Sequence, residues 1–249
     1  TMDEFAVVLK GLEEAGMVIL LDKYRGGESR EALVARFVKA RGGDTKKALN
    51  LLKDDLTWRE EHKMNEFRML TAGQVLLEDK YPLSRKKHDE LFSHGFLGYD
   101  KFNRPILYKW YNKNYVIPFA EGLDVDTMSK YNMWMVERLQ ASMEDRGQWT
   151  IIIDLDDYSV FMASPKNLRY CNSLATVDAA HYPERLGHIF IINAPGLFSA
   201  AWKIIASWID APTRAKVSLL SRDQWRGPLG ETMDLDLLPE HLGGRTVLQ

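Results

Sequence analysis

The sequence has little of what marks a secreted or membrane-spanning protein. Its 249 residues include a single cysteine, Cys171, so no disulfide can form within the chain, which favours a reducing compartment. No apolar run approaches the roughly 20 residues that span a bilayer, and the first residues lack the cationic start of a secretory signal. We therefore expect a cytoplasmic location.

The sequence also lacks an excess of either charge. It has 33 basic and 35 acidic residues, and its formal net charge of -2 offers no general attraction to nucleic acid or to an acidic membrane surface. Any anion-binding site must therefore be local. Hydrophobic residues at 45% and charged residues at 27% are ordinary values for a folded globular protein.

Common catalytic motifs are missing as well. There is no G-x-S-x-G elbow, glycine-rich phosphate loop, H-E-x-x-H or paired Cys/His spacing, so we expect no metal site. The one enzyme-like signal is Asp154-Leu155-Asp156 at the end of an apolar strand, which resembles the first motif of haloacid-dehalogenase-type phosphatases. Tyr158 follows where that family usually has Thr or Val. A strand-end turn is thus the favoured interpretation, and a Mg²⁺-dependent phosphatase using Asp154 and Asp156 is a remote alternative.

The first part of the chain predicts an all-helical lobe. Apolar residues at helical spacing indicate helices over 3–21, 29–41 and 44–61. Ser29 and Asp44 are suited to cap the second and third of these, and glycine pairs at 26–27 and 42–43 end the segments before them. We place the lobe at residues 1–80, with a charged helical connection over 81–92.

The remaining residues, 81–249, predict an α/β domain. Strands are expected over 96–99, 105–111, 148–154, 188–192 and 217–220, and helices over 124–146 and 164–180. A strand, a helix and a second strand in succession form a parallel crossover unit, so the sheet should be mostly parallel with helices on its faces.

The stretch 181–216 is the most distinctive. After the strand, Asn193 and Pro195 are expected to start a helix, and Asp210 with Pro212 to start a short turn carrying Thr213 and Lys216. We expect the helix between them to have one apolar face. This face is either plain core or, because it carries two tryptophans, a boundary between hydrocarbon and water. The face comprises Phe198, Ala201, Trp202, Ile205, Trp208 and Ile209.

Taken together, the ordered motifs resemble the CRAL-TRIO lipid-binding family, whose type member is the fungal phosphatidylinositol/phosphatidylcholine transfer protein. The resemblance covers nearly the whole chain from about Arg36. It rests on Arg36 to Arg41 with Trp58-Arg59, Asp100 with Asn103-Arg104-Pro105, Ile151 to Asp154, Tyr182-Pro183-Glu184-Arg185, Ile192-Asn193-Ala194-Pro195, Thr213 to Lys216, and Leu238-Pro239-Glu240 with Gly243-Gly244.

This resemblance implies a helical lobe followed by an α-β-α sandwich whose mostly parallel sheet encloses a hydrophobic lipid pocket. The helix from Phe198 to Ile209 would be the gate over that pocket, and the strand 188–192 its floor. By the same resemblance, Arg41 and Lys216 would hold the phosphate of a phosphoinositide, while Glu184 and Thr213 would join the network around the inositol hydroxyls.

The chain departs from the family pattern at two places. Gly42-Gly43 replaces basic and aromatic residues that commonly follow the arginine, so one positive charge near the headgroup is lost. Positions where phosphatidylcholine-binding members have tyrosines and small hydroxyls are occupied by Phe96, Leu107, Trp149 and Ile151. A choline headgroup pocket is therefore not expected.

We accordingly expect a non-enzymatic, monomeric lipid-binding and transfer protein that exchanges phosphatidylinositol with a second hydrophobic ligand. It would need no cofactor besides the bound lipid and no nucleic acid. It would associate transiently and peripherally with membranes and present its lipid to a lipid kinase in phosphoinositide signalling. The alternative is a CRAL-TRIO ligand sensor or carrier for a sterol-like or tocopherol-like molecule, squalene or haem.

Overall fold

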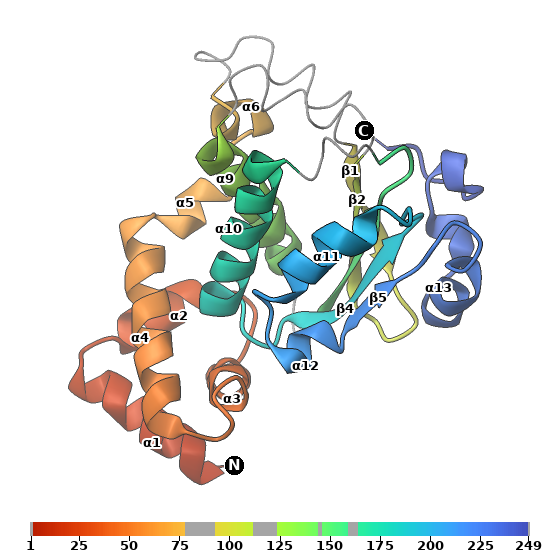
Figure 1. Cartoon of the computed structure of the whole chain (residues 1–249). Helices are drawn as coiled ribbons and strands as arrows, with labels where there is room; N and C mark the ends of the chain where they lie inside the picture. Colours follow the sequence, from red (N-terminus) through yellow and green to blue (C-terminus); the bar gives the residue numbers. More distant parts are fainter. Residues whose placement is uncertain (1, 78–92, 112–123, 144–145, 159–163, 249) are drawn as a thin grey trace.

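The chain folds into a helical lobe packed against an α/β domain, as Figure 1 shows. The structure is a computed structural model, and it describes residues 2–77, 93–111, 124–143, 146–158 and 164–248. The expected boundary between residues 80 and 81, and the expected helical connection over 81–92, lie outside the described residues.

The helical lobe is built on four helices and two short ones. Its elements are α1 (Met2–Glu14), α2 (Val18–Tyr24), α3 (Arg30–Lys39), α4 (Thr45–Glu61), α5 (Met64–Phe67) and α6 (Ala72–Val75). Leu12, Leu21, Phe37 and Leu52 are fully or almost fully buried at its centre. The side chains of Ser29 and Asp44 accept hydrogen bonds from the first turns of α3 and α4, so both expected caps are confirmed.

The first expected helix, over 3–21, is wrong in one respect. The chain breaks into α1 and α2 around Gly16, whose φ of 68° lies in the left-handed region that glycine adopts without a steric cost. The break turns α2 so that Leu21 and Tyr24 reach the same core as Leu12.

A five-stranded sheet forms the centre of the second domain. Its strands are β1 (His94–Tyr99), β2 (Pro105–Trp110), β3 (Trp149–Asp154), β4 (Leu186–Ile192) and β5 (Val217–Leu219). They lie in the order β1-β2-β3-β4-β5; β1 pairs antiparallel with β2, and all other pairs are parallel. The predicted α/β class with a mostly parallel sheet is therefore confirmed.

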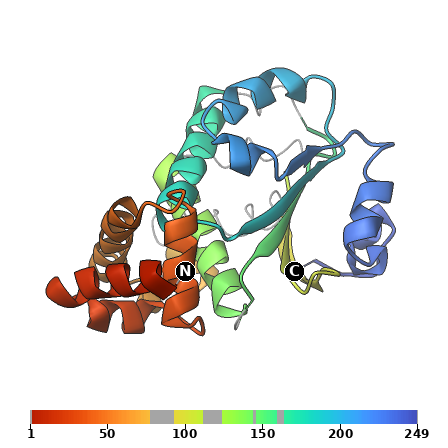
Figure 2. The same cartoon turned by 90° about the horizontal axis from the view of Figure 1, so that it is seen from below.

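Helices cover both faces of this sheet, as Figure 2 shows from below. One face carries α9 (Val125–Ala141), α10 (Pro165–His181) and α11 (Phe198–Ala206), and the other carries α13 (Arg226–Thr232). The short α12 (Ala211–Arg214) leads into β5, and 3₁₀ turns at Leu235–Leu237 and Glu240–Leu242 follow α13. The helix expected over 124–146 ends earlier, at Ala141.

Strand residues alternate between the two faces. Tyr108, Ile152 and Phe190 pack with α13, whereas the residues beside them in sequence, such as Ile151 and Ile191, face α9, α10 and α11. The second face is the one that carries the cavity described below.

Buried ion pairs fasten the lobe to the α/β domain. Arg59 of α4 donates hydrogen bonds to Asp55 at 3.0 Å and to Glu137 of α9 at 2.9 Å, and all three side chains are buried. Tyr182 donates to the same oxygen of Glu137 at 2.7 Å. Because each carboxylate is paired, the network fixes how α4 lies against α9 and α10.

Candidate functional site

An apolar cavity of about 210 Å³ lies between the sheet, α10 and α11. Its floor includes Ile189 and Ile191 of β4, in line with the expected role of that strand, and α10 contributes a stripe from Leu168 to Asp178. Trp149 and Ile151 also line it, whereas Leu107 belongs to the neighbouring core and Phe96 is 48% exposed at another surface. The volume is below the roughly 300–1,000 Å³ of common ligand pockets, so a large ligand requires the walls to move.

The helix α11 covers this cavity. Phe198 and Ala201 are buried against Leu155 and Ile191, and Trp202, Ile205 and Ile209 also line the cavity. Trp208 is the exception among the six expected gate residues: it does not line the cavity and is 37% exposed. The helix ends at Ala206, so Trp208 and Ile209 lie in the following turn, from which Ile209 but not Trp208 reaches the cavity.

The outer side of α11 is apolar too. Leu197 is 64% exposed and Ile204 is 46% exposed. Leu197, Ile204 and Trp208 are spaced by seven and then four residues, which places them on one side of the segment. Exposed apolar side chains gathered on one helix mark a surface that contacts other apolar material. The segment therefore has one side against the cavity and an adjoining apolar side exposed to solvent.

Three charged side chains meet where the lobe contacts the α/β domain. The ammonium group of Lys39, at the end of α3, lies 2.8 Å from Glu184 Oε2, and that of Lys216 lies 3.6 Å from the same oxygen. Burial opposes ionisation of Glu184, but the two ammonium groups outweigh it and hold the pKa of this carboxyl below its usual value. One carboxylate cannot neutralise two ammonium groups, so the cluster keeps a positive charge that suits a phosphate.

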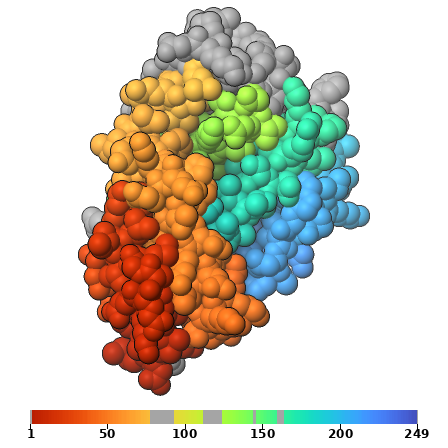
Figure 3. All heavy atoms as spheres, turned by 90° about the vertical axis from the view of Figure 1, so that its left-hand side faces the viewer, coloured from red at the N-terminus to blue at the C-terminus, as the bar shows by residue number. Residues whose placement is uncertain are grey.

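Contacts with the helical lobe hold the turn that carries Glu184 in place. Arg36 donates a hydrogen bond to the carbonyl of Pro183 at 2.8 Å, and Arg185 pairs with Glu28 at 2.8 Å. Glu184 itself has a φ of 58°, in the left-handed region that costs a residue with a Cβ about 1 kcal/mol or more. These contacts offset that cost and fix the direction of the carboxylate. Figure 3 shows the lobe, α10 and the segment that follows it side by side on this face.

The side chains of the other two expected headgroup residues have partners outside this cluster. Arg41 donates to the carbonyl of Ala40 at 3.0 Å, at the end of its own helix. Thr213 donates to Asp210 at 3.0 Å, and its carbonyl accepts the backbone N–H of Lys216 at 3.0 Å. The structure thus joins Glu184 and Lys216 directly and adds Lys39, which the sequence interpretation missed although Lys39 stands two residues before Arg41.

A polar group inside the cavity was also missed. Lys109 of β2, Asn132 of α9 and Asp178 of α10 all line it. A signal existed, because Lys109 is the single charged residue of a strand that is otherwise buried and apolar or aromatic.

Asp154 lies outside this cavity and serves as a buried hydrogen-bonding centre at the end of β3. Its Oδ1 accepts from Asn193 at 2.7 Å and from the Asp156 backbone at 2.9 Å, and its Oδ2 accepts from Tyr108 at 2.7 Å and faces His241 Nε2 at 3.2 Å. Asp156 pairs with Arg222. These occupied oxygens favour the strand-end turn, and in the described part of the chain no cluster of side chains suited to a metal ion is found.

The expected helix start at Asn193 and Pro195 is wrong. Asn193 adopts a φ of 53°, and its side chain bonds to Asp154 and accepts from the Trp225 indole at 3.0 Å, so it ties β4 to its neighbours instead of capping a helix. The helix begins at Phe198. The second expected cap is confirmed, because Asp210 accepts from the backbone of Thr213 at 2.7 Å.

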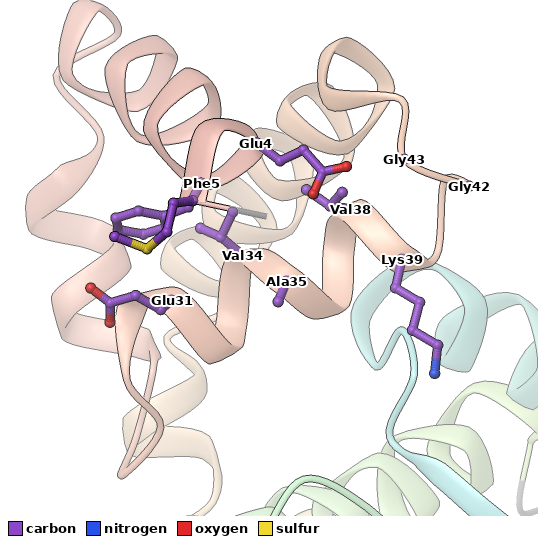
Figure 4. A pocket seen from close by; sticks show the side chains of 10 residues that line it. Glu4, Phe5, Glu31, Val34, Ala35, Val38, Lys39, Gly42 and Gly43 are labelled. Carbon is purple, nitrogen blue, oxygen red and sulfur yellow. The ribbon is translucent and has the colours of Figure 1, made fainter.

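A second hollow, of about 560 Å³, is an open groove between α1 and α3 in the lobe. Figure 4 shows Phe5 and Val34 within it, and Lys39 at its edge with the ammonium group turned away toward the connection between α10 and β4. Because Lys39 reaches Glu184 from this edge, the groove lies outside the charged cluster.

An α/β domain with an apolar cavity closed by a helix is the architecture of a protein that encloses a hydrophobic molecule. Among the helices that the structure describes, none combines the length and apolarity needed to cross a membrane. The chain belongs to the CRAL/TRIO domain family, whose model matches residues 90–244. It is therefore a member of a lipid-binding and lipid-transfer family.

Curated relatives agree with this assignment. The chain is 26% identical to "Protein real-time" of Drosophila melanogaster, covering 85% of this chain and 32% of the relative. It is 25% identical to "Phosphatidylinositol/phosphatidylcholine transfer protein SFH9" of Arabidopsis thaliana, over 84% and 36%, and 28% identical to "Phosphatidylinositol transfer protein CSR1" of Eremothecium gossypii, over 86% and 47%. The chain thus spans about a third to a half of these relatives.

Among solved structures, the crystal structure of Sfh5 is similar to this chain with a TM-score of 0.66 at 18% identity, covering 88% of this chain and 81% of Sfh5. At this identity the likeness supports the fold alone. It agrees with the layered α/β domain and helical lobe described above.

Proposed function

We propose that this chain binds phosphatidylinositol and exchanges it with a second hydrophobic ligand at membrane surfaces, without catalysing a reaction. The observation that carries the proposal is the pairing of a closed apolar cavity with a positively charged cluster at Lys39, Glu184 and Lys216. Two relatives are named as phosphatidylinositol transfer proteins, which supports the same ligand.

The headgroup would bind at the charged cluster. Lys39 and Lys216 would donate to the phosphate, and Glu184, already oriented by its turn, would accept from inositol hydroxyl groups. Arg41 and Thr213 would join by leaving their present partners, which are a backbone carbonyl and an exposed carboxylate. Each charge-assisted hydrogen bond contributes about 1.5–3 kcal/mol, so each basic residue should matter by about tenfold or more in affinity.

The acyl chains would enter the cavity when α11 moves. Burial of hydrocarbon contributes about 0.8 kcal/mol per CH₂, which is close to what the bilayer interior supplies, so extraction is nearly balanced. The rate would then depend on opening α11, whose exposed Leu197, Ile204 and Trp208 would lie on the membrane in the open state. Presentation of the bound lipid to a lipid kinase remains a prediction.

Charge reversal tests the headgroup assignment. The double variant Lys39→Glu/Lys216→Glu should reduce phosphatidylinositol transfer between vesicles by more than about tenfold, with Arg41→Glu tested separately. The matched control reverses two exposed lysines in i,i+4 pairs elsewhere, Lys10 (75% exposed side chain) and Lys130 (52%). Equal transfer by the site variant and the control would show that the cluster does not bind the headgroup.

The size of the cavity favours a second candidate function. A cavity of about 210 Å³ needs to expand less to hold one hydrophobic molecule than to hold the two acyl chains of a phospholipid. In that case the chain would be a carrier or sensor of a non-phosphoinositide ligand, such as a sterol-like or tocopherol-like molecule, squalene or haem. Native mass spectrometry of protein purified from a eukaryotic host would then show this ligand and no phosphoinositide.

A further inference from the structure

The cavity has a polar group set into an apolar wall. Lys109 is 4% exposed, and its ammonium group donates a hydrogen bond to the side-chain oxygen of Asn132, which is also 4% exposed. Asp178 lines the cavity from α10. Around them the wall is formed by residues such as Ile153, Leu174 and Trp202. A lysine buried among such side chains loses hydration, which disfavours the empty fold and points to a function.

The group has unused hydrogen-bonding capacity. An ammonium group carries three donors, and within the described part of the chain Lys109 uses one of them, on Asn132. The carboxylate of Asp178 accepts no hydrogen bond from the described residues, and its exposed surface faces the cavity. Lys109 and Asp178 form no ion pair with each other among the described residues, so donor capacity on β2 and acceptor capacity on α10 are left over in the same cavity.

Lys109 and Asp178 each affect the pKa of the other. Burial lowers the pKa of Lys109 to about 8, although the carboxylate of Asp178 opposes this shift. Burial raises the pKa of Asp178 to about 6, and Lys109 opposes that shift. Near pH 7 both are therefore mainly charged, and the pair is neutral overall.

We propose that Lys109, Asn132 and Asp178 form a polar anchor that binds the hydroxyl group of a hydrophobic ligand inside the cavity. The inference rests on the proposed function, because it concerns the second ligand of the same cavity. A hydroxyl can accept from Lys109 and donate to Asp178 at once, which uses both free capacities without adding charge. A carboxylate would bring a second negative charge beside Asp178, and a hydrocarbon would leave both groups unpaired.

A second polar atom lies further along the same helix. Asn167 is 6% exposed and lines the cavity, and its side-chain oxygen has no hydrogen-bond partner among the described residues. It lies three helical turns from Asp178, roughly 16 Å at about 1.5 Å per residue. Between them α10 presents Leu168, Leu174 and other apolar or weakly polar side chains. A ligand hydroxyl therefore has a hydrogen-bonding partner at each end of this stripe.

Matched probes test the anchor. Dodecanol, dodecane and dodecanoic acid share one chain length and differ in the end group, and their affinities can be measured near pH 7 by displacement of the apolar fluorophore diphenylhexatriene. Lys109→Met and the isosteric Asp178→Asn should each weaken dodecanol binding by about tenfold without weakening dodecane binding. Lys10→Met, an exposed lysine of α1, is the control.

The outcomes separate this inference from the proposed function. Unchanged dodecane affinity also shows that a variant is folded, and Asp178→Asn supplies the test if Lys109→Met does not fold. Equal changes for dodecanol and dodecane, or none, would overturn the anchor, and so would tighter binding of dodecanoic acid than of dodecanol by the unmodified protein. If diphenylhexatriene itself does not bind, the cavity takes no apolar ligand and the proposed function fails first.

Discussion

Two tryptophans near the gate should have separable roles. Trp202 lines the cavity, whereas Trp208 is 37% exposed on the outer stripe. A covered aromatic ring buries about 150–250 Å², so placing the exposed part of Trp208 in a membrane removes about 55–90 Å² from water. At about 25 cal/mol per Å² this amounts to about 1.4–2.3 kcal/mol, or about tenfold to fiftyfold in membrane partitioning.

We therefore expect Trp208→Ala to lower vesicle association and the rate of phosphatidylinositol transfer by about tenfold or more, with equilibrium ligand affinity unchanged. Trp202→Ala should instead weaken ligand binding, because it removes part of the cavity wall. Co-sedimentation with vesicles, fluorescent-lipid transfer and ligand displacement measure the three quantities, with Phe102→Ala, an aromatic residue 67% exposed in the β1–β2 turn, as the control. Trp208→Ala weakening ligand binding as much as Trp202→Ala would refute the division.

Three further predictions concern stability and the cavity. Because the pKa of Asp178 is raised to about 6, the folded state binds a proton that the unfolded state does not bind between about pH 4 and pH 6, and the stability gained from this proton is lost as pH rises. Asp178→Asn has no such proton to lose, so its free energy of unfolding relative to the unmodified protein should grow between pH 5 and pH 7 in urea unfolding. A constant difference would contradict this prediction. Arg59→Leu leaves Asp55 and Glu137 buried without their cation and should lower the free energy of unfolding by about 3–5 kcal/mol. Arg30→Ala, at an exposed ion pair, should change it little, and equal losses in the two variants would contradict the network. Cys171 lines the cavity and burial raises its pKa to about 11, so a thiol reagent should label it slowly and a bound ligand should slow labelling further; ligand-independent labelling would place ligands elsewhere.

Much of the fold followed from local patterns. The caps at Ser29 and Asp44, the buried strands and the crossover helix are set by neighbouring residues, so their positions were predictable. Two breaks were missed. Gly16 ends α1 with a left-handed backbone and local hydrogen bonds, so its signal was present in the sequence, whereas Asn193 depends on partners elsewhere in the chain. Asn193 in particular bonds to Asp154 and Trp225, two contacts that no local spacing indicates.

Part of the site was also predictable from sequence motifs. The ordered motifs indicated Glu184 and Lys216, which the structure joins, and most of the inward face of α11. Lys39 required knowing that α3 ends against the α10–β4 turn, a contact between distant segments. The proposed anchor depends on three elements that converge only in the folded chain. Its one sequence signal, a lysine at position 109 of an otherwise uncharged strand, was missed.

The most direct test of the account is native mass spectrometry after incubation with vesicles containing phosphatidylinositol. The protein should emerge carrying one phosphatidylinositol molecule, and the Lys39→Glu/Lys216→Glu variant should carry much less. A protein that returns without phosphatidylinositol, or a variant that binds as much as the unmodified protein, would contradict the proposal that the cavity and the charged cluster together hold this lipid.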